Sequence, residues 1–108
     1  MTIETLIALF EKYGEENIDR TTIGAEYRRT SRQDLDAFLL LDGLVPAEPI
    51  EGMHGYRRDM LGGAEHDKIW LDITPEQLAA VCTEEHIRVL SAFGVNYDSE
   101  FESLYMFV

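Results

Sequence analysis

The spacing of apolar residues changes at Thr74, and this change constrains the fold more than any other feature of the chain. Before it, apolar residues alternate with others from Ile69 to Ile73, which is the period of a strand with one buried face. After it, Thr74-Pro75-Glu76-Gln77 combines a capping hydroxyl, proline at the first helical position and a glutamine three residues after the cap. The sequence therefore predicts a strand over 68–73 followed directly by a helix over 75–82.

Three further helices are predicted, over about 3–13, 31–42 and 84–93, from apolar residues at helical spacing. Thr2 is the expected cap of the first helix, with Gly14 as its expected stop, and Thr83 is the expected cap of the helix over 84–93. The capping-box pattern Thr30-Ser31-Arg32-Gln33 is expected to start the second, which Asp42-Gly43 should end. The side chains expected in the core are Ile3, Leu6, Ile7 and Phe10, then Leu35, Phe38, Leu39 and Leu41, then Leu78, Val81 and Cys82, and finally Ile87, Leu90 and Phe93.

Two more strands are expected near the C-terminus, over 95–98 and 102–108, separated by a turn-like Asp98-Ser99-Glu100. The last is apolar on both faces, which is typical of a central or doubly covered strand. We therefore expect a single α+β domain spanning 1–108, with a three-stranded antiparallel sheet packed on one side by helices. Residues 46–64 carry most of the prolines and glycines, so a long loop is predicted there.

The net charge limits the partners of the chain. Twenty-one acidic residues against nine lysines and arginines give a formal net charge of −12. Nucleic-acid phosphates and anionic membranes should repel such a surface, whereas basic protein surfaces should attract it. No wholly apolar run is longer than that of residues 37–41, which is far shorter than the roughly 20 residues of a membrane-spanning helix. A single cysteine, Cys82, allows no internal disulfide, which indicates a reducing cytoplasm.

His66 and Asp67 form the most site-like pair, and His54 in the preceding loop is a third potential metal ligand. These three residues define one alternative function, a small metal-dependent hydrolase. The simpler interpretation is that His66 and Asp67 cap the first strand, since no second pair at metal-site spacing follows. We therefore expect no metal and no other cofactor.

Cys82 is a nucleophile only if a neighbour stabilises its thiolate, and His86 lies four residues away. The favoured interpretation is a small buried core residue. The arginine pairs Arg28-Arg29 and Arg57-Arg58 suggest either a local anion site or intramolecular partners for carboxylates, and the second is favoured. No catalytic motif was found, so the chain is not expected to be an enzyme.

Five segments in the C-terminal part of the chain carry a resemblance to known proteins: Ala64-Glu65-His66-Asp67-Lys68-Ile69-Trp70-Leu71-Asp72, Leu78-Ala79, Thr83-Glu84-Glu85, Gly94-Val95-Asn96-Tyr97-Asp98-Ser99 and Ser103-Leu104-Tyr105-Met106-Phe107-Val108. In these segments the chain resembles a family of small uncharacterised phage and prophage proteins. The resemblance implies a phage-encoded accessory protein that acts in the cytoplasm of a bacterial host. Small acidic phage proteins include inhibitors of host defence, such as anti-CRISPR proteins, so the analogy is to a class of protein.

Together these features predict a non-enzymatic protein-binding module. Its carboxylates would face a basic host protein or nucleoprotein complex, in place of phosphates, with no direct binding to nucleic acid or membrane. Net charge that serves only solubility is an equally weighted interpretation of the acidic surface. A structural or assembly component of a phage particle is a further alternative. The expected partner-binding residues are Glu84, Glu85, Tyr97, Asp98, Glu100, Phe101 and Glu102.

Overall fold

The computed structural model describes residues 1–48, 60–65 and 67–107. In these ranges the chain forms four α-helices, one short 3-10 helix and a four-stranded antiparallel sheet, which confirms the α+β prediction. The strand order is β1-β2-β4-β3. The elements are α1 (Ile3–Glu16), η1 (Arg20–Thr22), α2 (Gln33–Leu44), β1 (Leu61–Glu65), β2 (Lys68–Leu71), α3 (Pro75–Ala79), α4 (Glu84–Ala92), β3 (Asn96–Asp98) and β4 (Ser103–Phe107).

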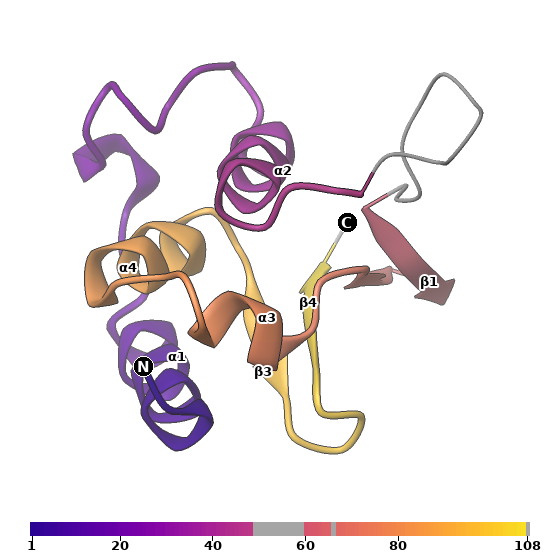
Figure 1. The fold of residues 1–108 in the computed structure, drawn as a ribbon. Helices are drawn as coiled ribbons and strands as arrows, with labels where there is room; N and C mark the ends of the chain where they lie inside the picture. Colours follow the sequence, from indigo (N-terminus) through magenta and orange to yellow (C-terminus); the bar gives the residue numbers. More distant parts are fainter. Residues whose placement is uncertain (49–59, 66, 108) are drawn as a thin grey trace.

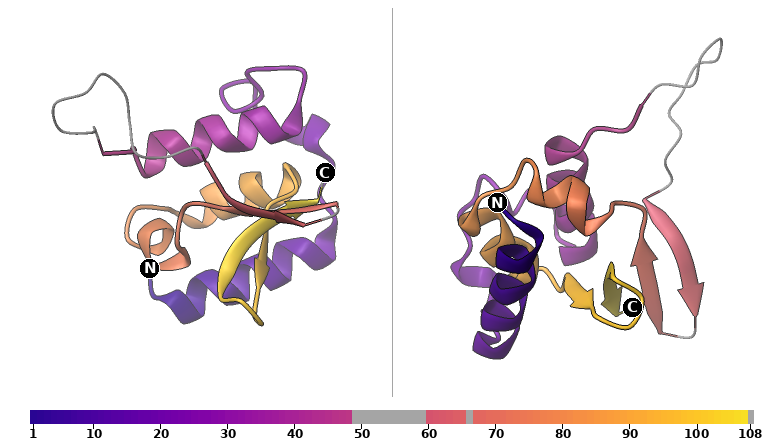
Figure 2. Two further views of the ribbon diagram at one scale, coloured as in Figure 1. Left: turned by 90° about the vertical axis from the view of Figure 1, so that its right-hand side faces the viewer. Right: turned by 60° about the horizontal axis from the view of Figure 1, so that its bottom comes forward.

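All four α-helices lie on one side of the sheet (Figure 1). The opposite face of the sheet carries no helix, as the turned view in Figure 2 shows with the strands in front. The inward face of the two central strands supplies Ile69, Leu71, Leu104 and Met106 to the core. These side chains meet the apolar side of α4, and α1 packs against α4 from below. The sheet is therefore buried on one face only.

The prediction of three strands was wrong, because β1 adds a fourth at the edge of the sheet. All of its residues except Glu65 were assigned to the loop over 46–64, of which 49–59 lie outside the described residues. The strand is difficult to predict from the sequence because of Gly62 and Gly63, since glycine has low strand propensity and interrupts the alternation of apolar residues. The pairing of β1 with β2 also shifts between Leu61 and Gly63, so no simple period of two exists to detect.

The helices that were predicted from capping residues begin where expected in three of four cases. Thr2, Thr74 and Thr83 each accept a hydrogen bond from a backbone N–H in the first turn of their helix, and the last two form full capping boxes. The prediction of a capping box before α2 was wrong. Arg32 is the N-cap there and makes no side-chain cap bond, because the Thr30 hydroxyl accepts from the Arg32 N–H and closes a local turn instead.

Two helices run past the glycines that were expected to end them. Helix α1 continues through Gly14 to Glu16 and ends at Asn17, whose φ of 50° gives the left-handed cap. Helix α2 likewise continues through Gly43 to Leu44. An interior glycine costs a helix only about 1 kcal/mol relative to alanine, so tertiary packing overrides it. In contrast, β2 and α3 end earlier than predicted, at Leu71 and Ala79.

The predicted core was wrong for one face of α2. Leu35 and Leu39 are 41% and 42% exposed, whereas Ala37 and Leu41 are buried. The apolar residues of α2 are distributed around its whole circumference, so their spacing does not identify which side of the helix faces the core. Val81 is also 48% exposed, since α3 ends before it. Every other side chain named for the core is buried or packs against it.

Asp36 is the buried residue that fixes α2 to the segment before it. Its Oδ1 accepts hydrogen bonds from the backbone N–H groups of Arg29 (3.1 Å) and Thr30 (2.8 Å). Its Oδ2 lies 3.4 Å from Nη2 of Arg20. One carboxylate thus accepts from two backbone donors and pairs with one cation. It connects α2 to the segment from Arg20 to Thr30, which has no regular structure after η1.

We expect Asp36→Ala to lower the free energy of unfolding by about 1–3 kcal/mol, because it leaves partly buried donors without an acceptor. The matched control is Asp34→Ala, which removes a carboxylate from the same helical turn but breaks only the more exposed ion pair with Arg32. That change should cost at most about 1 kcal/mol. Urea unfolding of both variants checks the prediction, and equal losses of stability would contradict it.

Candidate functional site

The uncovered face of the sheet carries four aromatic side chains. Trp70 on β2 is paired with Tyr105 on β4, and Phe107 stands two residues further along the same strand. Phe101, in the turn between β3 and β4, completes the group, with its ring 5.6 Å from that of Trp70 in an edge-to-face contact. Tyr105 and Phe107 make a similar contact at 5.5 Å. We call Trp70, Phe101, Tyr105 and Phe107 the aromatic face.

Lys68 lies within the aromatic face and is held there by a carboxylate. Its Nζ is 4.0 Å from the ring centre of Tyr105 and 5.2 Å from that of Trp70, both within cation–π range. The same Nζ is 2.8 Å from Oδ2 of Asp98. This hydrogen bond raises the pKa of Lys68 and lowers the pKa of Asp98. The only lysine of the face is therefore already neutralised within the molecule.

Asp98 also shapes the turn that carries Phe101. Its Oδ1 accepts hydrogen bonds from the backbone N–H groups of Glu100 (2.9 Å) and Phe101 (3.3 Å). Glu102 adopts a left-handed φ of 50° to bring the chain into β4. Because the other oxygen of Asp98 binds Lys68, the turn is tied to the middle of the sheet.

The aromatic face is accessible. Phe101 and Phe107 are each 61% exposed, the highest values among the large hydrophobic side chains that are described. The buried indole Nε1 of Trp70 has no hydrogen-bond acceptor in the described part of the chain. Contiguous exposed apolar surface of this kind is typical of interaction sites.

Carboxylates border the aromatic face on several sides, and we call this set the acidic rim. Glu65 shares an open hollow with Trp70 and Phe101 on the β1 side. On the β3 side, a hollow of about 340 Å³ is lined by Glu11 and Glu15 of α1 together with Tyr105. Glu100 and Glu102 lie in the exposed turn. The acidic rim comprises Glu11, Glu15, Glu65, Glu100 and Glu102.

Five of the seven expected partner-binding residues lie in the β3–β4 hairpin, and four of them are at its turn: Asp98, Glu100, Phe101 and Glu102. Tyr97 is paired with the buried Leu104, so it belongs to the inner face of the sheet and packs against the core.

Glu84 and Glu85 start α4, at the far side of the molecule from the hairpin (Figure 1). Glu84 accepts a hydrogen bond of 2.7 Å from the Tyr13 hydroxyl, which lowers the pKa of this glutamate. Lys12 pairs with the same carboxylate at 3.5 Å. The two glutamates therefore form a separate acidic surface.

Sequence reasoning missed three members of the aromatic face and three of the rim, Glu11, Glu15 and Glu65. The position of Trp70 could have been predicted, because side chains alternate along a strand and Trp70 therefore points to the face opposite to that of Ile69 and Leu71. Tyr105 joins it only through the pairing of β2 with β4, which the sequence does not reveal. Glu11 and Glu15 are four residues apart on one side of α1, but their position beside β3 depends on tertiary packing.

The residues considered for chemistry are arranged for structural roles. Cys82 is buried, and burial raises the pKa of its thiol, which opposes formation of a thiolate. His86 uses Nδ1 to accept from the backbone N–H of Thr83 and so completes the cap of α4. The favoured interpretation of Cys82 as a core residue is thereby confirmed.

The potential metal ligands fall largely outside the described residues. His54 and His66 are both in that part, and so are Arg57 and Arg58, whereas Asp67 is exposed in the turn after β1. Among the residues that the structure describes, no three His, Cys, Asp or Glu side chains are grouped as metal ligands would be. None of the described helices is long and apolar enough to cross a membrane.

Comparison of the chain with protein-family models, curated proteins and solved structures gives no match. Function is therefore inferred from the aromatic face and its surroundings.

The ion pair between Lys68 and Asp98 gives a testable prediction about the pKa of Asp98, on which its contribution to stability in acid depends. Because the folded-state pKa of Asp98 is lowered, its contribution to stability is complete above the ordinary pKa of aspartate and is lost as the pH falls through the folded-state pKa. We expect Lys68→Gln to raise the pKa of the Asp98 carboxyl, as followed by carbon-13 NMR. Arg88→Gln, which removes a cation paired with Glu85, is the matched control and should leave the Asp98 titration unchanged. An Asp98 pKa that is the same in all three proteins would contradict the assignment.

Proposed function

We propose that the protein is a non-enzymatic binding module that docks a basic protein surface on the aromatic face. The observation that carries this proposal is the set of four aromatic side chains on a helix-free sheet face, surrounded by the carboxylates of the acidic rim. Apolar anchors within a polar border are the usual anatomy of a protein interface.

The two parts of this surface have different energetic roles. Aromatic side chains are enriched among the residues that supply most of the binding energy in interfaces, and Phe101 and Phe107 have the most surface left to bury among the described members of the aromatic face. Carboxylates at the border mainly accelerate association with a cationic partner and select against acidic ones. The net charge of −12 extends this attraction beyond the contact itself.

Exposed aromatics on a sheet can also stack on the bases of single-stranded nucleic acid. That function needs cations along the phosphate backbone. Lys68 is bound to Asp98, and the five residues of the acidic rim would oppose phosphates. The charges around the aromatic face thus favour a protein as the partner.

The resemblance to small phage proteins suggests which partner to test first. We propose a nucleic-acid-handling host complex in the bacterial cytoplasm, of the kind that anti-CRISPR proteins inhibit. Glutamates of the acidic rim would there face lysines and arginines that otherwise hold phosphate. This part of the proposal is supported by the resemblance and by the sign of the charge alone.

The contribution of the hairpin charges can be measured with a double variant, Glu100→Gln with Glu102→Asn. Asparagine suits the left-handed backbone at 102, so folding should be preserved. We expect the partner captured from host lysate to associate several-fold more slowly with this variant and with a weaker salt dependence. The control is Glu84→Gln with Glu85→Gln, which removes the same charge from the other acidic surface. Equal effects of the two double variants would contradict the proposed location.

The aromatic anchor can be tested separately with Phe101→Ala. We expect about tenfold or greater loss of affinity for the captured partner, as at a binding hot spot. Leu35→Ala removes an exposed apolar side chain from α2 and should leave the affinity unchanged. Trp70, the single tryptophan, reports binding through its fluorescence. Unaltered affinity of the Phe101 variant, with its fold verified by circular dichroism, would rule out the aromatic face as the docking site.

A further inference from the structure

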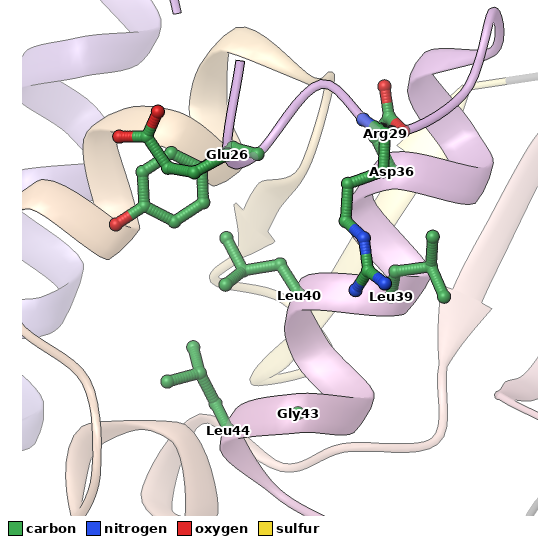
Figure 3. Close-up of a pocket in the computed structure, with 8 residues that line it drawn as sticks. Glu26, Arg29, Asp36, Leu39, Leu40, Gly43 and Leu44 are labelled. Atoms are coloured by element: carbon green, nitrogen blue, oxygen red, sulfur yellow. Dashed lines mark hydrogen bonds between the residues drawn. The ribbon is translucent and has the colours of Figure 1, made fainter. Parts of the chain in front are cut away.

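A second candidate site lies between α2 and the segment before it, and it shares no residue with the aromatic face or the acidic rim. It is a partly enclosed cavity of about 200 Å³. Its floor is apolar, formed by leucines on one side of α2 and by Tyr27, and an arginine stands at its edge (Figure 3). The lining residues are Glu26, Tyr27, Arg29, Asp36, Leu39, Leu40, Gly43 and Leu44.

Arg29 differs from the other lysines and arginines that the structure describes. Its backbone N–H binds Asp36, but its guanidinium makes no hydrogen bond or ion pair with any residue that the structure describes. Arg28 donates from Nε to the carbonyl of Ile23 at 2.6 Å. The remaining described lysines and arginines each have a carboxylate within 3.7 Å, namely Lys12, Arg20, Arg32, Lys68 and Arg88.

The carboxylates beside the cavity do not neutralise Arg29. Asp36 is occupied by the backbone N–H groups of Arg29 and Thr30 and by Arg20. The carboxylate of Glu26 lies against Gly24, and Figure 3 shows it at the opposite side of the cavity from the Arg29 guanidinium. The guanidinium reaches toward Leu39 and Leu40 instead. Among the described residues, the Arg29 guanidinium therefore has no charged partner and lies beside the apolar floor of the cavity.

We infer that this cavity binds a small aliphatic carboxylate. The Arg29 guanidinium would hold the carboxylate with paired N–H donors, a geometry that suits this anion. The hydrocarbon chain would lie over Leu39, Leu40 and Leu44, and it would cover Leu39, which is 42% exposed. The volume is below the roughly 300–1,000 Å³ of sites for drug-sized ligands, so the chain must be short.

The negative net charge of the chain repels an anion at long range, so the binding test needs an ionic strength that screens this repulsion. At an ionic strength near 0.15 M the screening length is about 8 Å, so distant carboxylates are screened while the direct contact with Arg29 persists. The binding assay therefore uses this ionic strength at pH 7, where a carboxylate ligand is ionised.

The experiment is a titration of methyl-labelled protein with hexanoate, followed by NMR at the methyl groups of Leu39, Leu40 and Leu44. We expect saturable shifts confined to these leucines. Acetate, which lacks the chain, and hexan-1-ol, which lacks the charge, should each bind at least tenfold more weakly. Shifts that fail to saturate with hexanoate, or equal binding of hexan-1-ol, would overturn the inference.

Two matched pairs of variants separate the charge from the cavity. Arg29→Gln should weaken hexanoate binding at least tenfold, whereas Arg32→Gln, which removes the same charge from a residue paired with Asp34, should not. Gly43→Leu should fill the cavity, because Gly43 lines it and a Cβ added there would have no other atom within 4 Å. Gly14→Leu is its control in α1, where a side chain also meets open space. Binding that survives both Arg29→Gln and Gly43→Leu would place the ligand elsewhere and contradict the inference.

Discussion

The pairing of β2 with β4 is the constraint on which the rest of the structure depends. In this register Ile69 is opposite Met106 and Trp70 is opposite Tyr105, so one face of the sheet is aliphatic and the other aromatic. Side chains alternate with a period of two, and a shift of one residue would turn the aromatic rings into the core. The core beneath the helices and the exposed surface proposed to bind a partner are thus two consequences of one register.

Two carboxylates complete the architecture by ordering segments that have little regular structure. Asp36 collects backbone N–H groups and a cation at the start of α2, and Asp98 does the same at the β3–β4 turn with Lys68. Each is almost fully buried, and each is paired, which is the condition under which a buried charge is tolerated. The cations that pair with these two buried carboxylates are Arg20 and Lys68. Arg29 differs because its guanidinium has no such partner in the described part of the chain.

The sequence predicted what local chemistry determines and failed where tertiary context decides. The caps at Thr2, Thr74 and Thr83 were readable because each depends on a hydroxyl within its own first turn. Strand β1 was not, since its glycines acquire strand geometry only by pairing with β2. The candidate site divided in the same way: the hairpin residues are neighbours in sequence and were found together, whereas Trp70, Tyr105 and Glu15 meet through the fold.

The acidic rim also bears on what can occupy the aromatic face. An exposed apolar patch invites self-association, yet a second copy of the chain would bring two acidic rims and two net charges of −12 together. Like charges across a contact are unfavourable, and the repulsion acts before the aromatic surfaces touch. Phosphate-bearing ligands meet the same barrier. A cationic partner meets none, because every carboxylate that repels a copy of the chain attracts it. In the function that we propose, the arrangement of rings and charges would therefore select the occupant by the sign of its charge, and the aromatic side chains would supply the affinity.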